Sequence, residues 1–249
     1  MKIVVCVSHV PDTATRIKIG SDVKTIDPNG VTYIINPYDE YAVEEALKLK
    51  ERSGSGEVVA VSVGTDNSKE TIRKALAMGV DSAVLLKDEN HRDSLGIAKA
   101  LAEEIKAQGA KLVFMGKQSV DYDNSIVGQL TAELLDYNCV PVVVKLEIEG
   151  EKVIAEREIE GGREVVETSL PVVITCQKGL NEPRYASLKG IMAAKKKTIE
   201  EKPAASFTPT SEVLKMYLPP GKQPGRIIGS DASAVPELVR LLKEEAKVI

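Results

Sequence analysis

The sequence predicts an α/β protein with a doubly wound, mostly parallel sheet that carries helices on both faces. Short apolar segments alternate with longer amphipathic segments over roughly the first 140 residues, and glycines or helix-capping residues separate them. Strands that alternate with helices form right-handed crossover units, which place the strands parallel to one another. A chain of 249 residues is long enough to bury a substantial core.

The strands expected in this first region are apolar and rich in β-branched residues without alternation, which is typical of strands buried on both faces. They are residues 2–8, 32–35, 57–63, 83–86 and 112–115. A long polar loop, residues 9–30, separates the first two strands.

Four helices are expected in the same region, and each begins near a capping residue. They begin at Asn36-Pro37, at Asp66 or Asn67, at Asp93 or Ser94, and at Asn124 or Ser125. The first stops before Ser53-Gly54, and the third ends at Gly109. We expect the buried side of the fourth helix to carry Ile126, Val127, Leu130, Leu134 and Leu135.

After about residue 140 the pattern changes to an antiparallel extension, residues 140–168. Its expected strands, 141–148, 152–159 and 164–168, are joined by hairpin turns at Glu149-Gly150-Glu151 and Glu160-Gly161-Gly162. Residues 170–176 return to the main sheet. We therefore divide the chain into a core, residues 1–197, and an extended, partner-embracing arm with a terminal helix, residues 198–249, which we expect to lie on another surface, its own or a partner's. Prolines exclude a long helix from most of that arm.

Composition excludes several classes of function. The net charge of −4 argues against an electrostatic nucleic-acid binder, and no apolar run is long enough to span a membrane. The three cysteines lie far apart and there are only two histidines, so zinc, iron–sulfur and haem sites lack ligands. The chain begins directly with a strand and not with a signal peptide, which favours a prokaryotic cytoplasm, or a trimmed chain in the mitochondrial matrix.

One stretch, KLVFMGKQSVDYDNSIVGQ at residues 111–129, combines a strand, a glycine, an acidic loop and a helix start. This arrangement brings backbone N–H groups together at the carboxyl edge of a sheet, where phosphates bind. An ordinary strand-to-helix turn with a polar loop is the alternative. The motifs GxSxG, GxGxxG and GxxxxGK[ST] are absent, so serine hydrolase, dinucleotide and P-loop chemistry is not indicated.

Residues 180–197, LNEPRYASLKGIMAAKKK, are similar to the partner-recognition loop of electron transfer flavoprotein β subunits. Other agreements lie across most of the chain, with the proline-rich arm, residues 198–230, weakly covered. They are Asn36-Pro37, residues 42–46, residues 70–73 and 75–79, Gly116-Lys117-Gln118, and residues 156–162 followed by 170–173.

The resemblance implies a non-catalytic subunit of a heterodimeric electron carrier. A larger α subunit would hold most of an FAD, while this chain would bury an AMP. Electrons would pass from flavin dehydrogenases, such as the acyl-CoA dehydrogenases of fatty acid β-oxidation, to a membrane quinone oxidoreductase. The cofactor-binding positions carried over from the family are Cys6, Asn36, Pro37, Tyr38, Asp39, Val63, Gly116, Lys117, Gln118, Ser119, Val120, Asp121, Asp123, Asn124, Ser125, Ile126 and Val127. Tyr38 matches an aromatic position beside the flavin; local packing is its alternative role.

The resemblance also implies a set of partner-binding residues. Leu188 matches the hydrophobic anchor that enters a pocket on the dehydrogenase, and Glu158 matches a glutamate that contacts the flavin domain of the α subunit. The remaining positions are Arg184, Tyr185, Ile191, Met192, Lys195, Lys196 and Lys197. The lysines would steer acidic partners, or form a solvated helix end. Glu158 is alternatively a surface acid at a strand end.

One departure leaves an alternative open. Mammalian-type β subunits have Asn-Gln-Thr where this chain has Ser125-Ile126-Val127, so two side-chain donors to the phosphate are lost. Electron-bifurcating relatives, which use NADH and hold a second FAD in place of AMP, also carry valine at the third position. Residues 121–124 and the lysine run favour the AMP type. A stand-alone nucleotide-binding stress-type protein, a flavin-free homodimer, is a further alternative.

Overall fold

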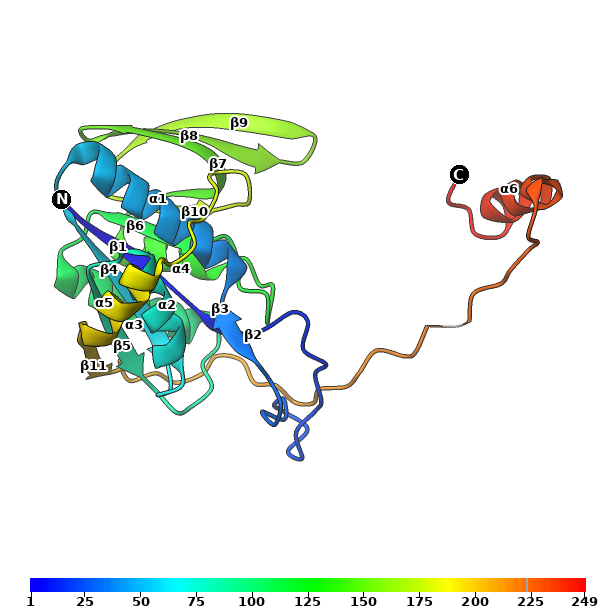
Figure 1. Cartoon of the computed structure of the whole chain (residues 1–249), viewed down its shortest axis with the longest axis horizontal. Coiled ribbons are helices and arrows are strands. Elements are labelled where there is room, and N and C mark those ends of the chain that lie inside the picture. Colours follow the sequence, from blue (N-terminus) through cyan, green and yellow to red (C-terminus); the bar gives the residue numbers. More distant parts are fainter. Residues whose placement is uncertain (223) are drawn as a thin grey trace.

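The computed structural model describes residues 1–222 and 224–249, and within them the chain forms a nine-stranded sheet and a separate two-stranded sheet (Figure 1). The order of the large sheet is β11-β5-β4-β1-β6-β10-β7-β8-β9. The strands are β1 (Lys2–Cys6), β2 (His9–Pro11), β3 (Tyr33–Ile35), β4 (Glu57–Gly64), β5 (Ser82–Lys87), β6 (Leu112–Gly116), β7 (Asn138–Glu149), β8 (Lys152–Ile159), β9 (Gly162–Ser169), β10 (Val172–Cys176) and β11 (Ile199–Pro203).

All neighbouring strands from β11 to β7 pair in parallel, whereas β7, β8 and β9 pair antiparallel. The predicted α/β fold with an antiparallel extension is therefore confirmed. The return of residues 170–176 to the main sheet is also confirmed, because β10 lies between β6 and β7.

Helices cover both faces of the parallel sheet. They are α1 (Pro37–Ser53), α2 (Ser68–Met78), α3 (Ser94–Gln108), α4 (Val127–Leu135) and α5 (Leu188–Lys196), followed by a short 3₁₀ helix η1 (Ala232–Ala234) and α6 (Val235–Glu244). One apolar cluster packs α1 and α2 against Val5 and Phe114, and the other packs α3 and α4 against Val4 and Val113. Neighbouring residues of β1 and β6 thus point to opposite faces, as in any strand. Among the described residues, no helix is both long and apolar enough to cross a bilayer.

For the fourth helix the predicted start is wrong, and the predicted buried side is confirmed only in part, since Val127 and Leu135 pack against the core. Helix α4 begins at Val127, with Ile126 at its N-cap, because Ser125 has a φ of 51° and cannot continue into a right-handed helix. Ile126 and Leu134 are 44% and 43% exposed. The buried residues are the smaller Gly128, Thr131 and Ala132, since a Cβ at Gly128 would collide with Thr175 of β10.

Two strands lie where none was predicted. β2, at the start of the predicted loop 9–30, pairs antiparallel with β3. β11 lies in the proline-rich region and pairs in parallel with β5. Its sequence, IEEKP, lacks an apolar run because it is an edge strand with exposed glutamates. Backbone hydrogen bonds and the buried Ile199 hold it in the sheet.

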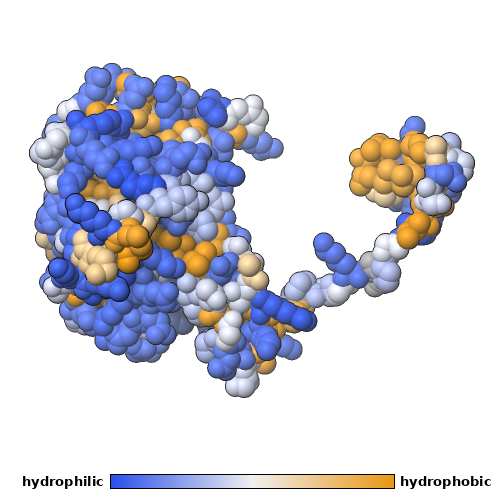
Figure 2. Space-filling model, in the orientation of Figure 1, coloured by the Kyte–Doolittle hydropathy of each residue, from blue (hydrophilic) through white to orange (hydrophobic). Residues whose placement is uncertain are grey.

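The arm follows the core before leaving it. Ala204 packs against the α3 side of the core, and the backbone N–H of Met216 donates to the carbonyl of Val23 at 2.7 Å. Beyond that point the chain leads to α6, which lies well away from the sheet (Figure 1). No residue of α6 is buried, and Figure 2 shows an apolar surface on this part of the molecule.

Candidate functional site

The order of the parallel strands reverses between β1 and β6. β1 pairs with β4 on one side and with β6 on the other, and the later strand β10 lies beyond β6. In open α/β sheets, ligands bind outside the carboxyl ends of the strands at such a reversal. Cys6 and Gly116 end β1 and β6, and Val63 is the penultimate residue of β4. The structure therefore brings these three predicted positions to one edge of the sheet.

Asp39 in the first turn of α1 bridges the ends of β1 and β6. One carboxylate oxygen, Oδ2, accepts a hydrogen bond from the backbone N–H of Ser8 at 2.7 Å. The other, Oδ1, accepts from the N–H of Gly116 at 3.0 Å and from Nδ2 of Asn36 at 2.9 Å. The side chain is only 4% exposed. These hydrogen bonds hold the first turn of α1 against the edge of the sheet where the strand order reverses.

Burial raises the pKa values of two groups at this edge, the Asp39 carboxyl and the Cys6 thiol. It raises the pKa of Asp39 from its usual 3.8 to about 7, although the hydrogen bonds from Asn36, Ser8 and Gly116 favour the ionised form. Burial and the neighbouring Asp39 both raise the pKa of the Cys6 thiol, which therefore stays protonated. Cys6 is consequently a small apolar wall and not a thiolate nucleophile.

Asn36 holds the loop that follows β6. It occupies the predicted N-cap position of α1, but its side chain makes no capping hydrogen bond. Instead Nδ2 donates to the carbonyl of Gln118 at 2.8 Å, and Oδ1 accepts from the N–H of Val120 at 3.3 Å. The residue is fully buried, so these backbone groups would otherwise lack partners. The expected side-chain cap is absent because Oδ1 of Asn36, the atom that would accept the capping hydrogen bond, is bonded to the loop instead.

The later part of the loop, residues 121–126, is exposed, and the loop is folded around the half-buried Gln118. Its Nε2 donates to Asp123 Oδ1 at 2.5 Å, and its Oε1 accepts from the hydroxyl of Ser125 at 2.7 Å. Asp123 and Ser125 both adopt the left-handed conformation, with φ of 52° and 51°. Asn124 donates to the hydroxyl of Ser94 at 3.0 Å and so ties the loop to α3. The chain then enters α4, whose first N–H groups have no acceptor within the helix.

The other predicted cofactor positions lie around this loop. Pro37 and Tyr38 open α1, and the ammonium group of Lys117 lies 5.1 Å from the centroid of the Tyr38 ring. Ser119 and Val120 are half-buried, whereas Asp121 and Ile126 are exposed. Val127 is the first residue of α4.

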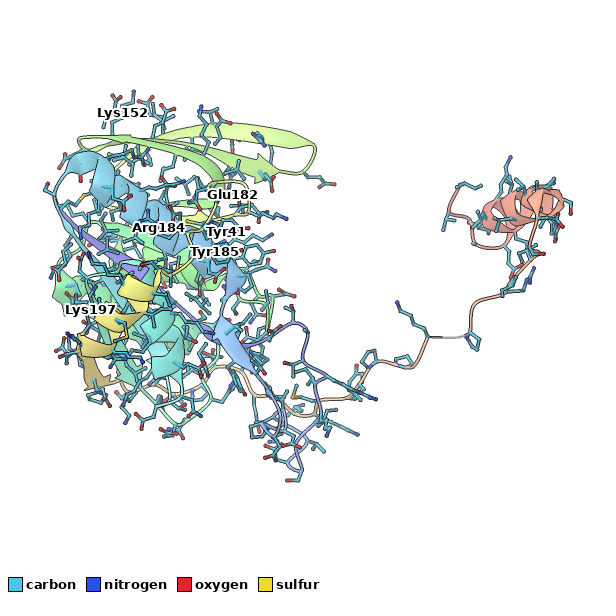
Figure 3. All side chains as sticks on the ribbon, viewed as in Figure 1. Tyr41, Lys152, Glu182, Arg184, Tyr185 and Lys197 are labelled. Atoms are coloured by element: carbon cyan, nitrogen blue, oxygen red, sulfur yellow. The ribbon has the colours of Figure 1, made fainter. Side chains whose placement is uncertain are left out.

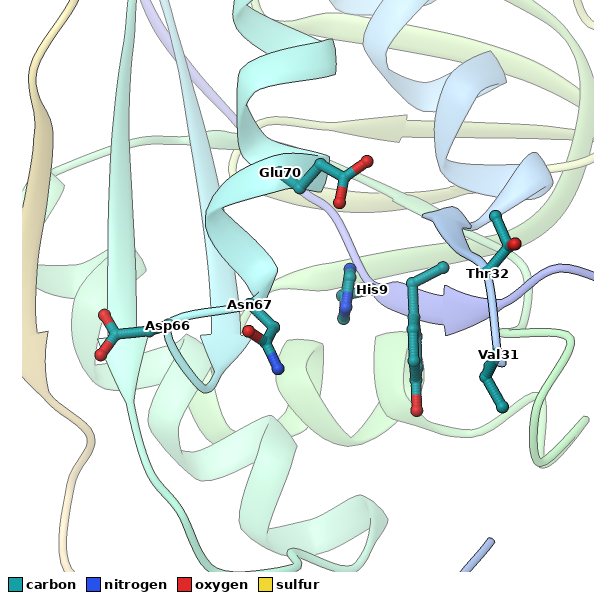
Figure 4. A pocket seen from close by; sticks show the side chains of 7 residues that line it. His9, Val31, Thr32, Asp66, Asn67 and Glu70 are labelled. Atoms are coloured by element: carbon teal, nitrogen blue, oxygen red, sulfur yellow. The ribbon is translucent and has the colours of Figure 1, made fainter. Parts of the chain in front are cut away.

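A hollow of about 430 Å³ lies next to this edge and was not predicted from the sequence (Figure 4). Its lining residues are His9, Val31, Thr32, Tyr33, Asp66, Asn67 and Glu70. His9 stacks on Tyr33 with ring centroids 4.5 Å apart, and burial lowers the pKa of its imidazole. The lining comes from a turn, strand ends and the first turn of α2, which are scattered along the sequence, so no local motif could reveal it.

The segment predicted to bind partners presents an apolar surface at the start of α5. Tyr185 is 99% exposed and Leu188 is 84% exposed, and Ile191 and Met192 are also exposed. A contiguous exposed apolar surface is uncommon on a soluble protein and often marks an interaction site. Glu158, also exposed, accepts a hydrogen bond from Gln177.

The basic residues of this segment differ in their surroundings. Lys195 and Lys196 are exposed, whereas the ammonium group of Lys197 donates to the carbonyl of Val80. Arg184 lies over α1 and pairs with Glu44 and Glu51 (Figure 3). Partner binding by Arg184 and Lys197 stays a prediction, and within the chain both hold the segment in place.

A comparison with protein families matches the electron transfer flavoprotein domain to residues 23–207. The chain belongs to the electron transfer flavoprotein family. It is 41% identical over 260 residues to the electron transfer flavoprotein subunit beta of Bacillus subtilis, with full coverage of both chains. It is 38% identical over 256 residues to the β subunit of Bos taurus, with coverage of 100% and 99%. The mitochondrial β subunit of Oryza sativa subsp. japonica is 39% identical over 257 residues, with full coverage of both. The resemblance to electron transfer flavoprotein β subunits is thus confirmed.

Proposed function

We propose that the chain is the β subunit of a heterodimeric electron transfer flavoprotein that carries electrons from flavin dehydrogenases to the quinone pool. In this proposal it holds an AMP as a structural nucleotide and helps an α subunit to hold FAD. The observation that supports it best is the edge between β1 and β6, where Asp39 and Asn36 fix the loop leading to α4. Acyl-CoA dehydrogenases are the proposed donors, and a membrane quinone oxidoreductase is the proposed acceptor.

The edge suits a nucleotide phosphate. The first N–H groups of α4 and the positive end of its dipole favour an anion. Ser125, just before this helix, adds a hydroxyl that can turn from Gln118 toward a phosphate oxygen. Gly116 allows the first turn of α1 to approach the end of β6 closely, since a Cβ at this position would meet Tyr38 and Asp39. The acid nearest to the helix start, Asp123, is engaged by the amide of Gln118.

The chain's own residues bind and orient, and bound FAD supplies the electron-carrying chemistry. The buried thiols of Cys6 and Cys176 have raised pKa values and stay protonated. Among the described residues, no cluster of three or more histidine, cysteine or carboxylate side chains could hold a metal ion. In this proposal the half-buried Tyr38 at the start of α1 contributes to one wall of the flavin site.

Docking to a dehydrogenase is assigned to the exposed surface around Leu188. A small contact with one apolar anchor suits a carrier that must leave each partner quickly. The exposed Lys195 and Lys196 would steer it toward acidic partners, an effect that weakens with salt.

The nucleotide content tests the proposal. The chain is co-expressed with its α subunit, the purified heterodimer is denatured, and the released nucleotides are separated and quantified. One AMP and one FAD per heterodimer is the expected result. A second FAD in place of AMP would instead indicate the bifurcating type, which is kept as the alternative because Val127 offers no side-chain donor at the helix start. A flavin-free homodimer would contradict both. A prokaryotic cytoplasm is the proposed location.

A further inference from the structure

The exposed segment Tyr185–Ala193, here called the docking segment, is held at both of its ends. On the entry side, Asn181 Nδ2 donates to the carbonyl of Tyr41 and to the carboxylate of Glu45, each at 3.0 Å. On the exit side, Arg73 donates to the carbonyls of Ala194 and Lys197, each at 2.5 Å. The docking segment is therefore presented from α1 and α2, although its own side chains are largely exposed.

Arg184, immediately before the docking segment, is bound by two acidic residues of α1. Its Nε and NH2 donate to the two carboxylate oxygens of Glu44 at 2.8 and 3.1 Å. Its NH1 and NH2 donate to the carboxylate of Glu51 at 2.6 and 3.0 Å. The guanidinium is thus forked between two acids of α1. Both acids raise the pKa of Arg184, which stays charged.

The two carboxylates are not equivalent. The side chain of Glu44 is 3% exposed, whereas that of Glu51 is 58% exposed. Only Glu44 also accepts a hydrogen bond from the backbone N–H of Arg184, at 3.1 Å. Charge-assisted hydrogen bonds to a buried group are stronger than those in solvent, and a forked pair fixes direction as well as distance. Glu44 therefore fixes both the side chain and the backbone of residue 184.

The ion pair of Glu44 and Arg184 lies directly before the exposed surface and can therefore fix its position. Tyr185, the next residue, is 99% exposed, and Leu188 lies three residues further on. Between the two held ends, Gly190 packs so closely on α2 that a Cβ would collide with the carbonyl of Ala77. A segment held before binding loses less conformational freedom when it meets a partner, which strengthens the complex without new contacts.

We propose that Glu44 is a positioning residue that orients the docking segment through Arg184, so that the apolar surface around Leu188 meets its partner in one conformation. The inference rests on the proposed docking function. Arg184 then acts through α1 and not on the partner directly. The partner chemistry that fits is an apolar pocket with an acidic rim, because the exposed Lys189, Lys195 and Lys196 flank the apolar side chains.

The test compares Glu44→Gln with Glu51→Gln in the heterodimer with its α subunit. Each substitution removes one carboxylate from the same guanidinium while keeping nearly the same shape. Amide hydrogen exchange is measured across residues 184–193, and steady-state turnover is measured with an acyl-CoA dehydrogenase reduced by its substrate. Leu188→Ala serves as the reference for loss of docking. FAD content and thermal unfolding are recorded for every variant.

In Glu44→Gln, exchange across the docking segment is expected to accelerate by about tenfold, and KM for the heterodimer to rise by about the same factor with kcat nearly unchanged. Glu51→Gln is expected to stay within about twofold of wild type in both measurements, because the Glu51 carboxylate is itself largely solvated. Arg184→Lys, which retains the positive charge beside Glu44 but loses the fork, should shift both quantities in the same direction. It also provides the measurement should Glu44→Gln fail to fold.

Wild-type exchange and KM in both Glu44→Gln and Arg184→Lys would overturn the inference. If Leu188→Ala still raised KM in that experiment, the proposed docking function would stand without it. If Leu188→Ala left KM unchanged, the proposed docking function would fail and the inference would fall with it. A general loss of FAD and stability in Glu44→Gln, with normal exchange and KM in Arg184→Lys, would mean that Glu44 merely supports the fold.

Discussion

The carboxylate of Asp39 lies 3.0 Å from the backbone nitrogen of Gly116, so the first turn of α1 is bonded directly to the last residue of β6. The contact leaves no room for a side chain at position 116, where a Cβ would meet Asp39 and would lie 2.7 Å from the Cβ of Tyr38. Glycine is therefore required here because α1 approaches the backbone of β6 closely. Backbone conformation is not the reason, because the φ of Gly116 is not positive.

Gly116→Ala is expected to separate α1 from β6 and to loosen the loop that follows. Overpacking at such a contact destabilises a protein by about 1–3 kcal/mol. We expect a lower thermal unfolding temperature and, in the proposed heterodimer, a reduced content of the proposed structural nucleotide. Gly162→Ala is the matched control, because nothing lies within 4 Å of its Cβ position and its φ is not positive. Equal stability and nucleotide content in the two variants would contradict the assigned contact.

Asp39 is also expected to make stability depend on pH. Its folded pKa of about 7 lies above the usual 3.8, so the folded chain binds the extra proton between these values. The contribution is therefore fully present below about pH 4 and is lost as the pH rises through 7, with a total on the order of 4 kcal/mol.

Chemical denaturation of wild type and Asp39→Asn between pH 4 and 8 measures the contribution of Asp39 to the free energy of unfolding. The difference in unfolding free energy between the two proteins isolates it, because the other titrating groups are shared. Wild type should lose stability relative to the variant as the pH rises. A difference that stays constant across this range would show that Asp39 is ionised throughout.

The sequence was sufficient for the parallel core because its central strands are buried on both faces. Residues 57–63 and 112–115 are continuous apolar runs, and the glycines or capping residues beside them mark the turns. β11 was missed because an edge strand needs no such run: Glu200 and Glu201 face solvent, and the paired backbone alone reveals the strand.

The site was predictable to the level of strand ends, and no further. Cys6, Val63 and Gly116 lie at or near the ends of predicted parallel strands, and the carboxyl ends of parallel strands meet at one edge of a sheet. The bridge made by Asp39 could not be inferred from pattern, because an acid in the first turn of a helix is usually a solvated partner of the helix dipole. Similarly, a basic residue such as Arg184 gives no sign in the sequence that its charge is turned inward to Glu44.

Leu188→Ala tests the proposed docking surface. An exposed apolar anchor that fills a partner's pocket contributes on the order of 2 kcal/mol, or roughly thirtyfold in affinity. Turnover with an acyl-CoA dehydrogenase should fall accordingly, while FAD content and thermal unfolding stay at wild-type values because Leu188 is 84% exposed. Val165→Ala on β9, 66% exposed, is the control and should leave turnover unchanged. Loss of FAD in Leu188→Ala would show that the residue is structural.

The carboxylate of Asp93 joins the arm to the core, so its removal is expected to detach the nearby part of the arm. Its Oδ1 accepts from the N–H of Gly96 and caps α3, while Oδ2 accepts from the N–H and hydroxyl of Thr210 and from the N–H of Ser211. Burial opposes the ionised form, but these hydrogen bonds outweigh it and lower the pKa of Asp93 to about 2. The carboxylate therefore stays charged, and the attachment intact, over the physiological range of pH.

Asp93→Ala is expected to free residues near Thr210 and to weaken α3 by about 1 kcal/mol through loss of its cap. Limited proteolysis should then cut the arm between Phe207 and Met216 faster than in wild type, since a segment is cleaved in proportion to its open population. Asp231→Ala removes a similar cap from η1, where the carboxylate accepts from Ser233 alone, and should leave cleavage near Thr210 unchanged. Identical cleavage rates in Asp93→Ala and wild type would mean that other contacts hold the arm without the carboxylate, such as the cation–π contacts of Arg92 and Lys99 with Phe207 and the hydrogen bond from Met216 to Val23.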